Sequence, residues 1–413
     1  MHNLLSINNY HYRRGGSDVM YFEHDALFKG IGWGTASFSM KHPKNISSEW
    51  EKYFIEELEF GQSYGVFDKL KMASKVIYSL EARSKITALL DHFSPDIAHI
   101  HCVYHHISPS ILPLLKERAI PLVYTAHDLK LACPAYKMLN QNGICEKCKD
   151  GNLLHLVANR CIHGSLATSG LVAVESALHR ILGLYKNTLD RIVAPSRFFK
   201  TKLEEWGWSA DKIVYIPNFV DEPKFEKHTS PGKYFLYFGR LAPEKGVETL
   251  IRACIASGCE LKIAGTGPSE LHLKSIASSN PKINFLGFKA GDDLWELVRG
   301  ARAVVLPSEW YENAPVSVLE AYAIGKIVIG ANIGGIPEMI VENETGFTFP
   351  SGATDALADV LKKVEAMDDA SIARMGEQSI EYVAQNYSQQ AYLERMLSLY
   401  ENLLSKRNEI IAG

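Results

Sequence analysis

The chain of 413 residues has no long apolar run and only a small excess of charge. None of its apolar stretches approaches the about 20 residues that a helix needs to span a bilayer. We expect no export signal, because the N-terminal residues Met1–Leu5 meet the polar Asn8 and Asn9 and the charged Arg13 too early. A net charge of −3 argues against a general nucleic-acid binder. These absences favour a cytoplasmic protein with no nucleic-acid partner.

The length of the chain predicts two domains, because one compact core rarely serves so many residues. A hydrophobic content of 46% with 22% charged residues is typical of a globular protein. Residues 217–232 are polar and rich in turn-forming residues, so we interpret them as a linker. We therefore expect an N-terminal domain over residues 1–216, a C-terminal domain over 233–385, and a final segment over 386–413.

Strands and helices alternate after the linker, which predicts a parallel, doubly wound α/β sheet. We expect strands near residues 234–239, 259–264, 283–287, 303–307, 326–330 and 346–349. Helices are expected near residues 246–257, 268–279, 291–300, 315–325 and 353–366.

Two glutamates eight positions apart, Glu312 and Glu320, follow the expected strand at 303–307. Pro315 suits the first turn of a helix, where no backbone N–H group is needed. Two helical turns cover about seven residues, so Glu320 falls close to the face of Glu312. The end of a strand beside the start of a helix is where open α/β sheets bind ligands.

Two basic residues, Arg240 and Lys245, lie between the expected strand that ends at Gly239 and the expected helix that begins at Gly246. Cations beside the N-terminus of a helix suit a diphosphate. Arginine offers a planar fork of donors, whereas lysine offers a mobile point charge. The alternative is a solvated loop with ordinary surface charges.

The N-terminal half is less regular. A short strand at residues 4–7 precedes Gly15 and Gly16, which let the backbone approach a ligand closely. Ser17 or Asp18 can cap the helix that follows. Further buried strands are expected at residues 97–101 and 122–125.

Four of the seven cysteines cluster in an insertion over about residues 133–163. The spacing of Cys133, Cys145, Cys148 and Cys161 suits a tetrahedral structural zinc site, in which His163 could replace one thiol. Unpaired thiols are the first alternative. Disulfides are the second, although they do not persist in a reducing compartment.

Two further segments each allow two structural interpretations. Residues 166–184 are apolar and helix-like within a basic region, so we favour a core helix with a solvated edge over a helix that rests on anionic lipid. The tail at residues 387–406 predicts a long amphipathic helix. Packing on the first domain and pairing in a dimer are the two options for it.

The chain resembles glycosyltransferase family 4, the retaining nucleotide-sugar transferases with the GT-B fold, most strongly from Tyr234 to about Pro350. The resemblance rests on the G-R-x-x-x-x-K-G run at residues 239–246, the spacing of Glu312 and Glu320, and several glycine-bearing segments, which are residues 265–268, 284–288 and 334–338. It covers nearly the whole chain. It implies two Rossmann-like, doubly wound domains that face each other across a cleft, with a C-terminal helix that crosses back to the N-terminal domain.

The resemblance also implies roles for individual residues. Arg240 and Lys245 would stabilise the diphosphate of the donor, and Glu312 would hold hydroxyls of the donor sugar. Glu320 would accept the ribose hydroxyls. His127 would contact the sugar and help to orient the donor, and it is not assigned as a general base.

The remaining expected contacts are backbone or edge positions. Gly15 and Gly16 would line the diphosphate from the opposite side of the cleft. The other candidates surround the nucleotide and the sugar, and they are Arg197, Gly239, Gly267, Phe288, Asn313, Ala314, Pro315 and Val316.

The resemblance predicts retaining transfer from a UDP- or GDP-sugar to a glycan or a lipid-linked glycan, in the synthesis of a bacterial surface polysaccharide. The acceptor class also allows peripheral contact with the inner face of the plasma membrane. We expect catalysis to need no metal cofactor, because no D-x-D-type acidic pair lies where a metal would bridge the phosphates. A nucleotide-sugar epimerase of similar fold and a non-catalytic nucleotide-sugar-binding protein are the alternatives.

Overall fold

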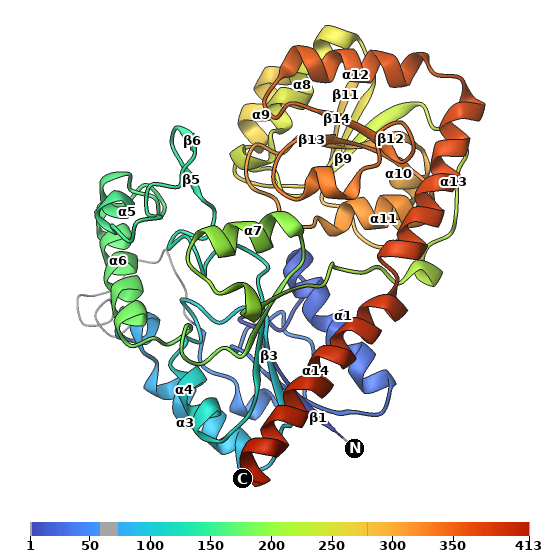
Figure 1. Cartoon of the computed structure of the whole chain (residues 1–413). Coiled ribbons are helices and arrows are strands. Elements are labelled where there is room, and N and C mark those ends of the chain that lie inside the picture. Colours follow the sequence, from blue (N-terminus) through green and yellow to red (C-terminus); the bar gives the residue numbers. More distant parts are fainter. Residues whose placement is uncertain (1, 58–72, 279, 413) are drawn as a thin grey trace. The chain divides into compact units, whose positions relative to one another are not determined.

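The computed structural model describes residues 2–57, 73–278 and 280–412 of the chain. These residues form two compact units (Figure 1). The first unit consists of Met1–Pro195, Phe199–Ile216 and Leu393–Gly413, and the second of Ser196–Phe198 and Pro217–Tyr392. In the part of the chain that is described, no helix is long and apolar enough to cross a membrane.

A six-stranded parallel sheet forms the centre of the first unit. Strand β1 (Asn3–Ile7) pairs with β2 (Gly34–Phe38) on one side and with β3 (Ile97–Ile100) on the other. Strands β4 (Leu122–Thr125), β7 (Arg191–Ala194) and β8 (Ile213–Tyr215) continue the sheet in that order. Parallel strands of this kind are buried because helices cover both faces.

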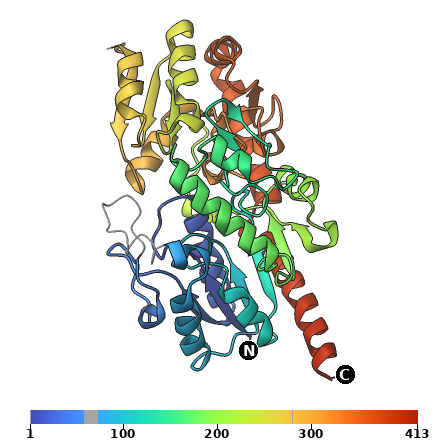
Figure 2. The ribbon, with the colours of Figure 1, turned by 90° about the vertical axis from the view of Figure 1, so that its left-hand side faces the viewer.

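The helices of the first unit lie on both faces of its sheet. Helix α1 (Gly16–Gly30) connects β1 to β2, and the chain then returns past β1 through α3 (Leu80–Leu90) and α4 (Ile111–Glu117). Because such crossovers are right-handed, the reversal places α1 on one face and α3 and α4 on the other (Figure 1). Figure 2 shows the molecule from the side of α3 and α4. This is a doubly wound domain.

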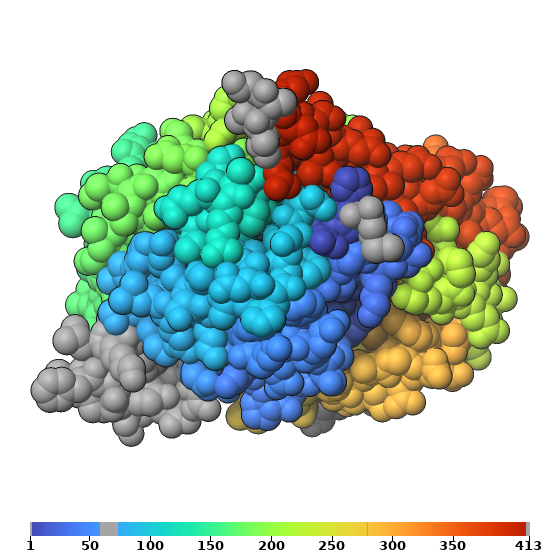
Figure 3. Space-filling view, turned by 90° about the horizontal axis from the view of Figure 1, so that it is seen from below, coloured from blue at the N-terminus to red at the C-terminus, as the bar shows by residue number. Residues whose placement is uncertain are grey.

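The C-terminal helix α14 (Gln389–Ala412) begins in the second unit and ends in the first. Its residue Tyr400 is fully buried, and the Tyr400 hydroxyl lies 3.0 Å from Nε2 of His24 in α1 and 2.5 Å from Nδ1 of His99 in β3. Figure 3 shows the atoms of α14 beside the N-terminal residues of the chain. The prediction that the tail helix packs on the first domain is therefore confirmed.

The second unit is built around another six-stranded parallel sheet, in the order β11-β10-β9-β12-β13-β14. All six strands were predicted from the sequence to within two residues at either end. They are β9 (Tyr234–Phe238), β10 (Leu261–Ala264), β11 (Ile283–Gly287), β12 (Ala301–Leu306), β13 (Ile327–Ala331) and β14 (Gly346–Phe349).

Helices cover both faces of this sheet and create two apolar cores. Strand β12 shows the division, because Ala303 and Val305 belong to one core and Val304 and Leu306 to the other. The first core includes α8 (Val247–Ser257), α9 (Glu270–Ala277) and α12 (Thr354–Ala366). The second includes α10 (Asp292–Arg299) and α11 (Val316–Ile324). Helix α13 (Asp369–Asn386), which packs on α11, was not predicted.

The Cys-rich segment of the first unit has little regular structure. It contains an antiparallel pair of two-residue strands, β5 (Leu139–Asn140) and β6 (Gly143–Ile144), and the short helix α5 (Leu154–Ala158). Helix α5 packs on α6 (Leu166–Ile181), and the first unit also contains most of α7 (Arg197–Glu205).

Helix α6 corrects one prediction. It was expected to turn its apolar side inward, but Leu166, Val174 and Ile181 are exposed, Ile181 by 80%. The buried side instead carries Glu175 and His179. This arrangement is stable because the Glu175 carboxylate lies 3.2 Å from Nζ of the buried Lys130, which compensates the buried charge.

Candidate functional site

The candidate site of the second unit lies at the carboxyl ends of the strands in its sheet. From β9 the chain proceeds through β10 and β11 on one side, and from β12 it proceeds through β13 and β14 on the other. Since β9 and β12 are neighbours, the strand order reverses between them. Ligands of open α/β sheets bind at such a reversal.

An ion pair between Lys245 and Glu312 joins the two loops at this point. Nζ of Lys245 lies 2.6 Å from Oε1 of Glu312, and the Ser308 hydroxyl donates to the same oxygen at 2.8 Å. Burial of Glu312 acts to raise the pKa of its carboxyl group, but the charge of Lys245 and these hydrogen bonds outweigh it and hold the pKa below its usual value. The ammonium group also lies 5.0 Å from the centre of the Trp310 ring. The sequence predicted both residues but not their pairing.

Arg240 supplies a second cation from the loop after β9. Its side chain is exposed, and it forms no ion pair with any residue that the structure describes. The Tyr237 hydroxyl donates to the Arg240 carbonyl at 2.8 Å and so fixes the backbone there. An anion at this edge can therefore bind Arg240 without breaking an existing pair.

The turn into α8 requires a glycine at position 246. Gly246 has a φ of 64°, and a Cβ atom there would lie 1.8 Å from the carbonyl oxygen of Pro307. The absence of a side chain lets the loops after β9 and β12 approach each other. This close approach brings Lys245 to Glu312.

The backbone of residues 312–315 is held from several sides. The N–H group of Gly335 donates to the Glu312 carbonyl at 2.8 Å, and a Cβ atom on Gly335 would lie 2.0 Å from the Asn313 carbonyl oxygen. Nδ2 of Asn218 donates to the Ala314 carbonyl at 2.8 Å. The Ser196 hydroxyl donates to Oδ1 of Asn313 at 2.9 Å. The sequence indicated no role for Asn218 or Ser308, whereas Gly335 lies in one of the glycine-bearing segments on which the family resemblance rests.

Helix α11 begins one residue later than Pro315 suggested. Pro315 is the N-cap residue, and Val316 is the first helical residue. Glu320 therefore lies in the second turn of α11. Burial raises the pKa of Glu320 to about 7, so that its carboxyl group is partly protonated near neutral pH and can either accept or donate a hydrogen bond.

Two further predicted residues lie at neighbouring strand ends. Phe288 follows β11 and is 73% exposed, so its ring is accessible to a ligand. Gly267 follows β10, where a Cβ atom would lie 2.2 Å from the Leu241 carbonyl oxygen. Gly239 connects β9 to Arg240 with a φ of 148°. The loops after β9, β10, β11 and β12 thus bring the predicted residues to one edge.

Arg197 has a backbone role in the structure. The carboxylate of Glu338 accepts the backbone N–H groups of Arg197 at 2.7 Å and of Phe198 at 2.5 Å. Glu338 thereby satisfies donors at the first turn of α7 and ties residues 196–198 to the second unit. Glu338 lies in the glycine-bearing segment at residues 334–338, from which this backbone contact was not predicted.

The predicted residues of the first unit lie at the ends of β1 and β4. Gly15 is the N-cap residue of α1 and Gly16 its first residue, with no side-chain cap. The prediction that Ser17 or Asp18 caps the helix is wrong, because both lie inside the first turn. The Asp18 carboxylate instead accepts Nδ2 of Asn8 at 3.0 Å. The N–H groups of the first turn of a helix have no partner within the helix, so they suit an anion.

His127 is part of a group of buried histidines. Its Nε2 lies 2.9 Å from Nδ1 of His101, and the two rings are stacked. Burial lowers the pKa of His127 to about 4, which keeps the ring neutral. A neutral ring can either donate or accept a hydrogen bond.

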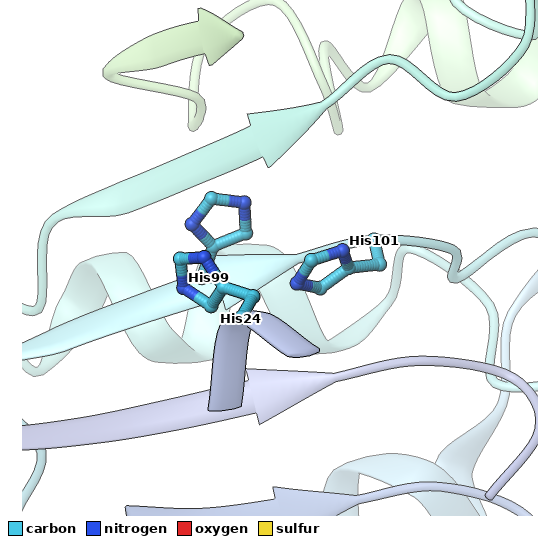
Figure 4. A group of neighbouring side chains, drawn as sticks. All are labelled: His24, His99 and His101. Atoms are coloured by element: carbon cyan, nitrogen blue, oxygen red, sulfur yellow. The ribbon is translucent and has the colours of Figure 1, made fainter. Parts of the chain in front are cut away.

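Three of these histidines have the spacing of metal ligands. Figure 4 shows His24, His99 and His101, each of which has a ring nitrogen within 4.8 Å of the others. Both nitrogens of His99 already have partners, since Nδ1 contacts the Tyr400 hydroxyl and Nε2 lies 2.7 Å from Oγ1 of Thr125. Burial lowers the pKa of all three rings. We therefore interpret the group as neutral. His24 and His99 are hydrogen-bonded to Tyr400, and the His99 ring stacks on the His101 ring, which in turn contacts His127.

The four cysteines of the insertion lie near one another but do not form a compact ligand set. All seven cysteines of the chain are described, and each is free. Burial, and then the neighbouring thiols of the set, raise the pKa of Cys133 and of Cys161 to about 11. Among the described residues, no three sulfurs of Cys133, Cys145, Cys148 and Cys161 lie within 4.8 Å of one another. A tetrahedral zinc ion with Zn–S bonds of about 2.3 Å needs sulfurs about 3.8 Å apart.

Comparisons with known proteins agree with this architecture. The family model for glycosyl transferases group 1 matches residues 220–382, and the model for Glycosyltransferase Family 4 matches residues 63–223. A D-inositol 3-phosphate glycosyltransferase of Corynebacterium glutamicum is 30% identical over 339 residues, which cover 76% of this chain and 73% of that protein. A colanic acid biosynthesis glycosyltransferase of Salmonella typhimurium is 27% identical over 52% of this chain and 57% of its own length.

Solved structures of similar fold cover nearly the whole chain. Sucrose-phosphate synthase from Thermosynechococcus elongatus has a TM-score of 0.71 at 19% identity, over 98% of this chain and 100% of that one. The Anabaena protein HepE, solved in complex with UDP, has a TM-score of 0.68 at 16% identity, over 97% of this chain and 100% of that one. These likenesses show the fold.

The two parallel α/β domains and the edge motif of the second domain define a protein with the GT-B fold. The chain belongs to glycosyltransferase family 4.

The pKa of Glu320 predicts a pH-dependent effect on stability. Because this pKa lies above the usual glutamate value of about 4.3, the folded protein holds the proton more tightly than the unfolded chain. Stability therefore falls as the pH rises from about 4.3 to about 7. The Glu320→Gln variant has no carboxyl group to titrate at this position. The melting temperature of the variant relative to that of the wild type should therefore increase between about pH 5 and about pH 8. The gain corresponds to on the order of 1–3 kcal/mol, since one pKa unit is about 1.36 kcal/mol.

Glu344→Gln is the matched control, because Glu344 is an exposed glutamate of the same unit. The difference in melting temperature between Glu344→Gln and the wild type should be the same at both pH values. A difference for Glu320→Gln that does not change with pH would show that the raised pKa is wrong.

Proposed function

We propose that the chain transfers a sugar from a UDP- or GDP-sugar to a glycan or lipid-linked glycan, with retention of configuration and without a catalytic metal ion. The observation that carries the proposal is the pairing of Lys245 with Glu312 beside the exposed Arg240, at the edge where the strand order reverses. HepE, which has a similar fold, has been solved with UDP and with UDP-glucose, and this supports a nucleotide-sugar donor.

The chemistry follows from the charges that the reaction creates. When the bond between the anomeric carbon and the diphosphate breaks, negative charge grows on the phosphate oxygen and positive charge on the sugar ring. Arg240 and Lys245 would stabilise the phosphate, and Glu312 would bind sugar hydroxyls. The acceptor oxygen would attack the anomeric carbon from the same face and release its proton to the departing diphosphate. Two protein cations can thus do the work of a bridging metal ion.

The ion pair gives the site a resting state. Without a donor, Lys245 compensates the charge of the buried Glu312. When the diphosphate binds, Lys245 would turn toward it, and the sugar hydroxyls would take its place at the carboxylate. One exchange of partners then keeps both charges satisfied.

We also propose that the product is a surface polysaccharide. Relatives of the chain include the colanic acid glycosyltransferase and an amylovoran biosynthesis glycosyltransferase of Erwinia amylovora, which is 31% identical over 186 residues. The chain spans only about half of these two relatives, 57% and 46% of their lengths.

A peripheral membrane contact at α6 is part of the proposal. Leu166, Val174 and Ile181 form an exposed apolar row, and Arg180 lies on the same helix. An apolar row beside basic residues suits an anionic lipid surface.

Flotation with anionic vesicles tests the membrane contact. Ile181→Ser should reduce the binding of the protein to the vesicles, and a wild-type protein that never floats with them would contradict the contact.

We further propose that the four cysteines bind one structural zinc ion. The Cys-rich segment has little core of its own, and four thiols lie close together in it, so a metal would hold the segment. The binding would draw the sulfurs together into a tetrahedron.

The zinc proposal predicts about one zinc ion per chain in protein purified without chelator. Cys148→Ser should lose the metal and lower the melting temperature. Cys254→Ser is the control for the metal content and should keep the zinc, because Cys254 lies in the core of the second unit and outside the Cys-rich segment. A zinc-free protein that binds no added zinc would contradict the site.

Loss of Lys245 should slow the chemical step. A charge-assisted hydrogen bond contributes about 1.5–3 kcal/mol, so Lys245→Ala should lower turnover at saturating donor by roughly tenfold to over a hundredfold. Glu320→Ala should instead weaken donor binding and raise the KM for the nucleotide sugar. Neither effect should depend on added magnesium.

Lys274→Ala is the matched control, because Lys274 is an exposed lysine that pairs with Glu270 in α9. It should leave kcat and KM unchanged. Normal turnover in Lys245→Ala would remove this residue from the mechanism.

A further inference from the structure

The first unit contains a pocket that the proposed donor chemistry does not use. It has a volume of about 480 Å³ and lies between the loop after β4, helix α6, the residues that follow α7, and residues 149–151 of the Cys-rich segment. Every wall of the pocket belongs to the first unit. The volume lies within the range of about 300–1,000 Å³ that is typical of small-molecule sites.

The wall of the pocket is basic. Among the described residues that line it, the formally charged side chains are those of Lys130, Lys149, Arg180, Lys186 and Asp150. One acid thus faces four bases. Lys149 also pairs with Glu205, at a distance of 3.3 Å.

Two of the bases keep an uncompensated charge. Lys130 is buried and neutralised by Glu175, but Arg180 and Lys186 are exposed. Neither Arg180 nor Lys186 forms an ion pair with a residue that the structure describes. Nη1 of Arg180 donates to the Gly151 carbonyl at 3.3 Å, which directs the guanidinium group toward the Cys-rich side of the pocket. An anion in the pocket would gain two partners.

Aromatic rings form another part of the wall. Trp206 and Trp208 both line the pocket, and both are partly exposed. The Trp208 indole N–H group donates to the Leu131 carbonyl at 2.9 Å, which holds the ring in place. A sugar ring has one apolar face and a polar rim, so a fixed indole ring beside charged groups suits a saccharide better than a bare ion.

We propose that this pocket binds a sugar that carries an anionic substituent, a carboxylate or a phosphate, within the glycan acceptor. Arg180 and Lys186 bind the anion, and the Trp208 ring contacts the sugar face. The assignment to an acceptor rests on the proposed function, whereas the binding of an acidic sugar rests on the pocket alone. The pocket explains why the Cys-rich segment needs a defined structure, because Gly151 and its neighbours form one wall.

Calorimetric titration of the full chain with four probes tests the proposal. The probes are trigalacturonate, N-acetylglucosamine 1-phosphate, maltotriose and inorganic phosphate. At least one of the two acidic sugars should bind at least about tenfold more tightly than maltotriose and inorganic phosphate, in line with one charge-assisted contact. The stronger of the two identifies the anion as a carboxylate or a phosphate. Binding of maltotriose or of inorganic phosphate with equal affinity would overturn the proposal.

Variants locate the binding. Arg180→Ala and Lys186→Ala change exposed side chains, so both should fold, and each should weaken the binding of the acidic sugar by about tenfold. Lys44→Ala is the control, because Lys44 is an exposed lysine of the first unit that does not line the pocket. Unchanged affinity in both pocket variants would overturn the site.

The titration separates this proposal from the proposed function. No nucleotide sugar is present, so a failed titration would leave the donor site of the second unit untouched. If the proposed donor site is wrong, the protein will bind no nucleotide, but the acidic sugar can still bind the pocket of the first unit.

Discussion

The ion pair between Lys245 and Glu312 is the interaction on which the candidate site depends. A buried carboxylate is costly unless a partner compensates it, and loss of one partner of such a pair typically costs about 3–5 kcal/mol. Lys245 can reach Glu312 because Gly246 allows the loops after β9 and β12 to approach closely. The hydrogen bond from Gly335 and the side chain of Asn218 then fix the loop that follows. The backbone of these loops thus determines where the Lys245 ammonium group lies.

The first unit also buries polar side chains, among them a group of histidines that are neutral rather than charged. Its buried histidines remain uncharged because burial lowers the pKa of each ring, and Tyr400 of α14 connects His24 to His99. The hydrogen bonds of Tyr400 therefore tie the C-terminal helix to α1 and to the sheet, and the stacking of the His99 and His101 rings extends the group to His127. This explains how a helix distant in sequence contributes to the support of a candidate donor contact.

The sequence predicted the second unit well because its strands and helices follow simple patterns. Each strand of its sheet is a short apolar run between turn residues, and the glycines at strand ends mark the loops. Helix α13 was missed although Ile372, Met375 and Val383 are buried at helical spacing on one of its faces. The face of α6 was misjudged because composition alone does not reveal that Glu175 is buried with Lys130. The pairing of Lys245 with Glu312 depends on loops 67 residues apart that only the fold brings together.

An equilibrium titration of the wild-type chain with UDP and with GDP, without added metal, tests the diphosphate site directly. We expect one of the two nucleotides to bind and Arg240→Ala to weaken the binding by about tenfold or more, because a charge-assisted hydrogen bond to the diphosphate is lost. No binding of either nucleotide, or binding that Arg240→Ala leaves unchanged, would contradict a diphosphate site at this edge of the sheet.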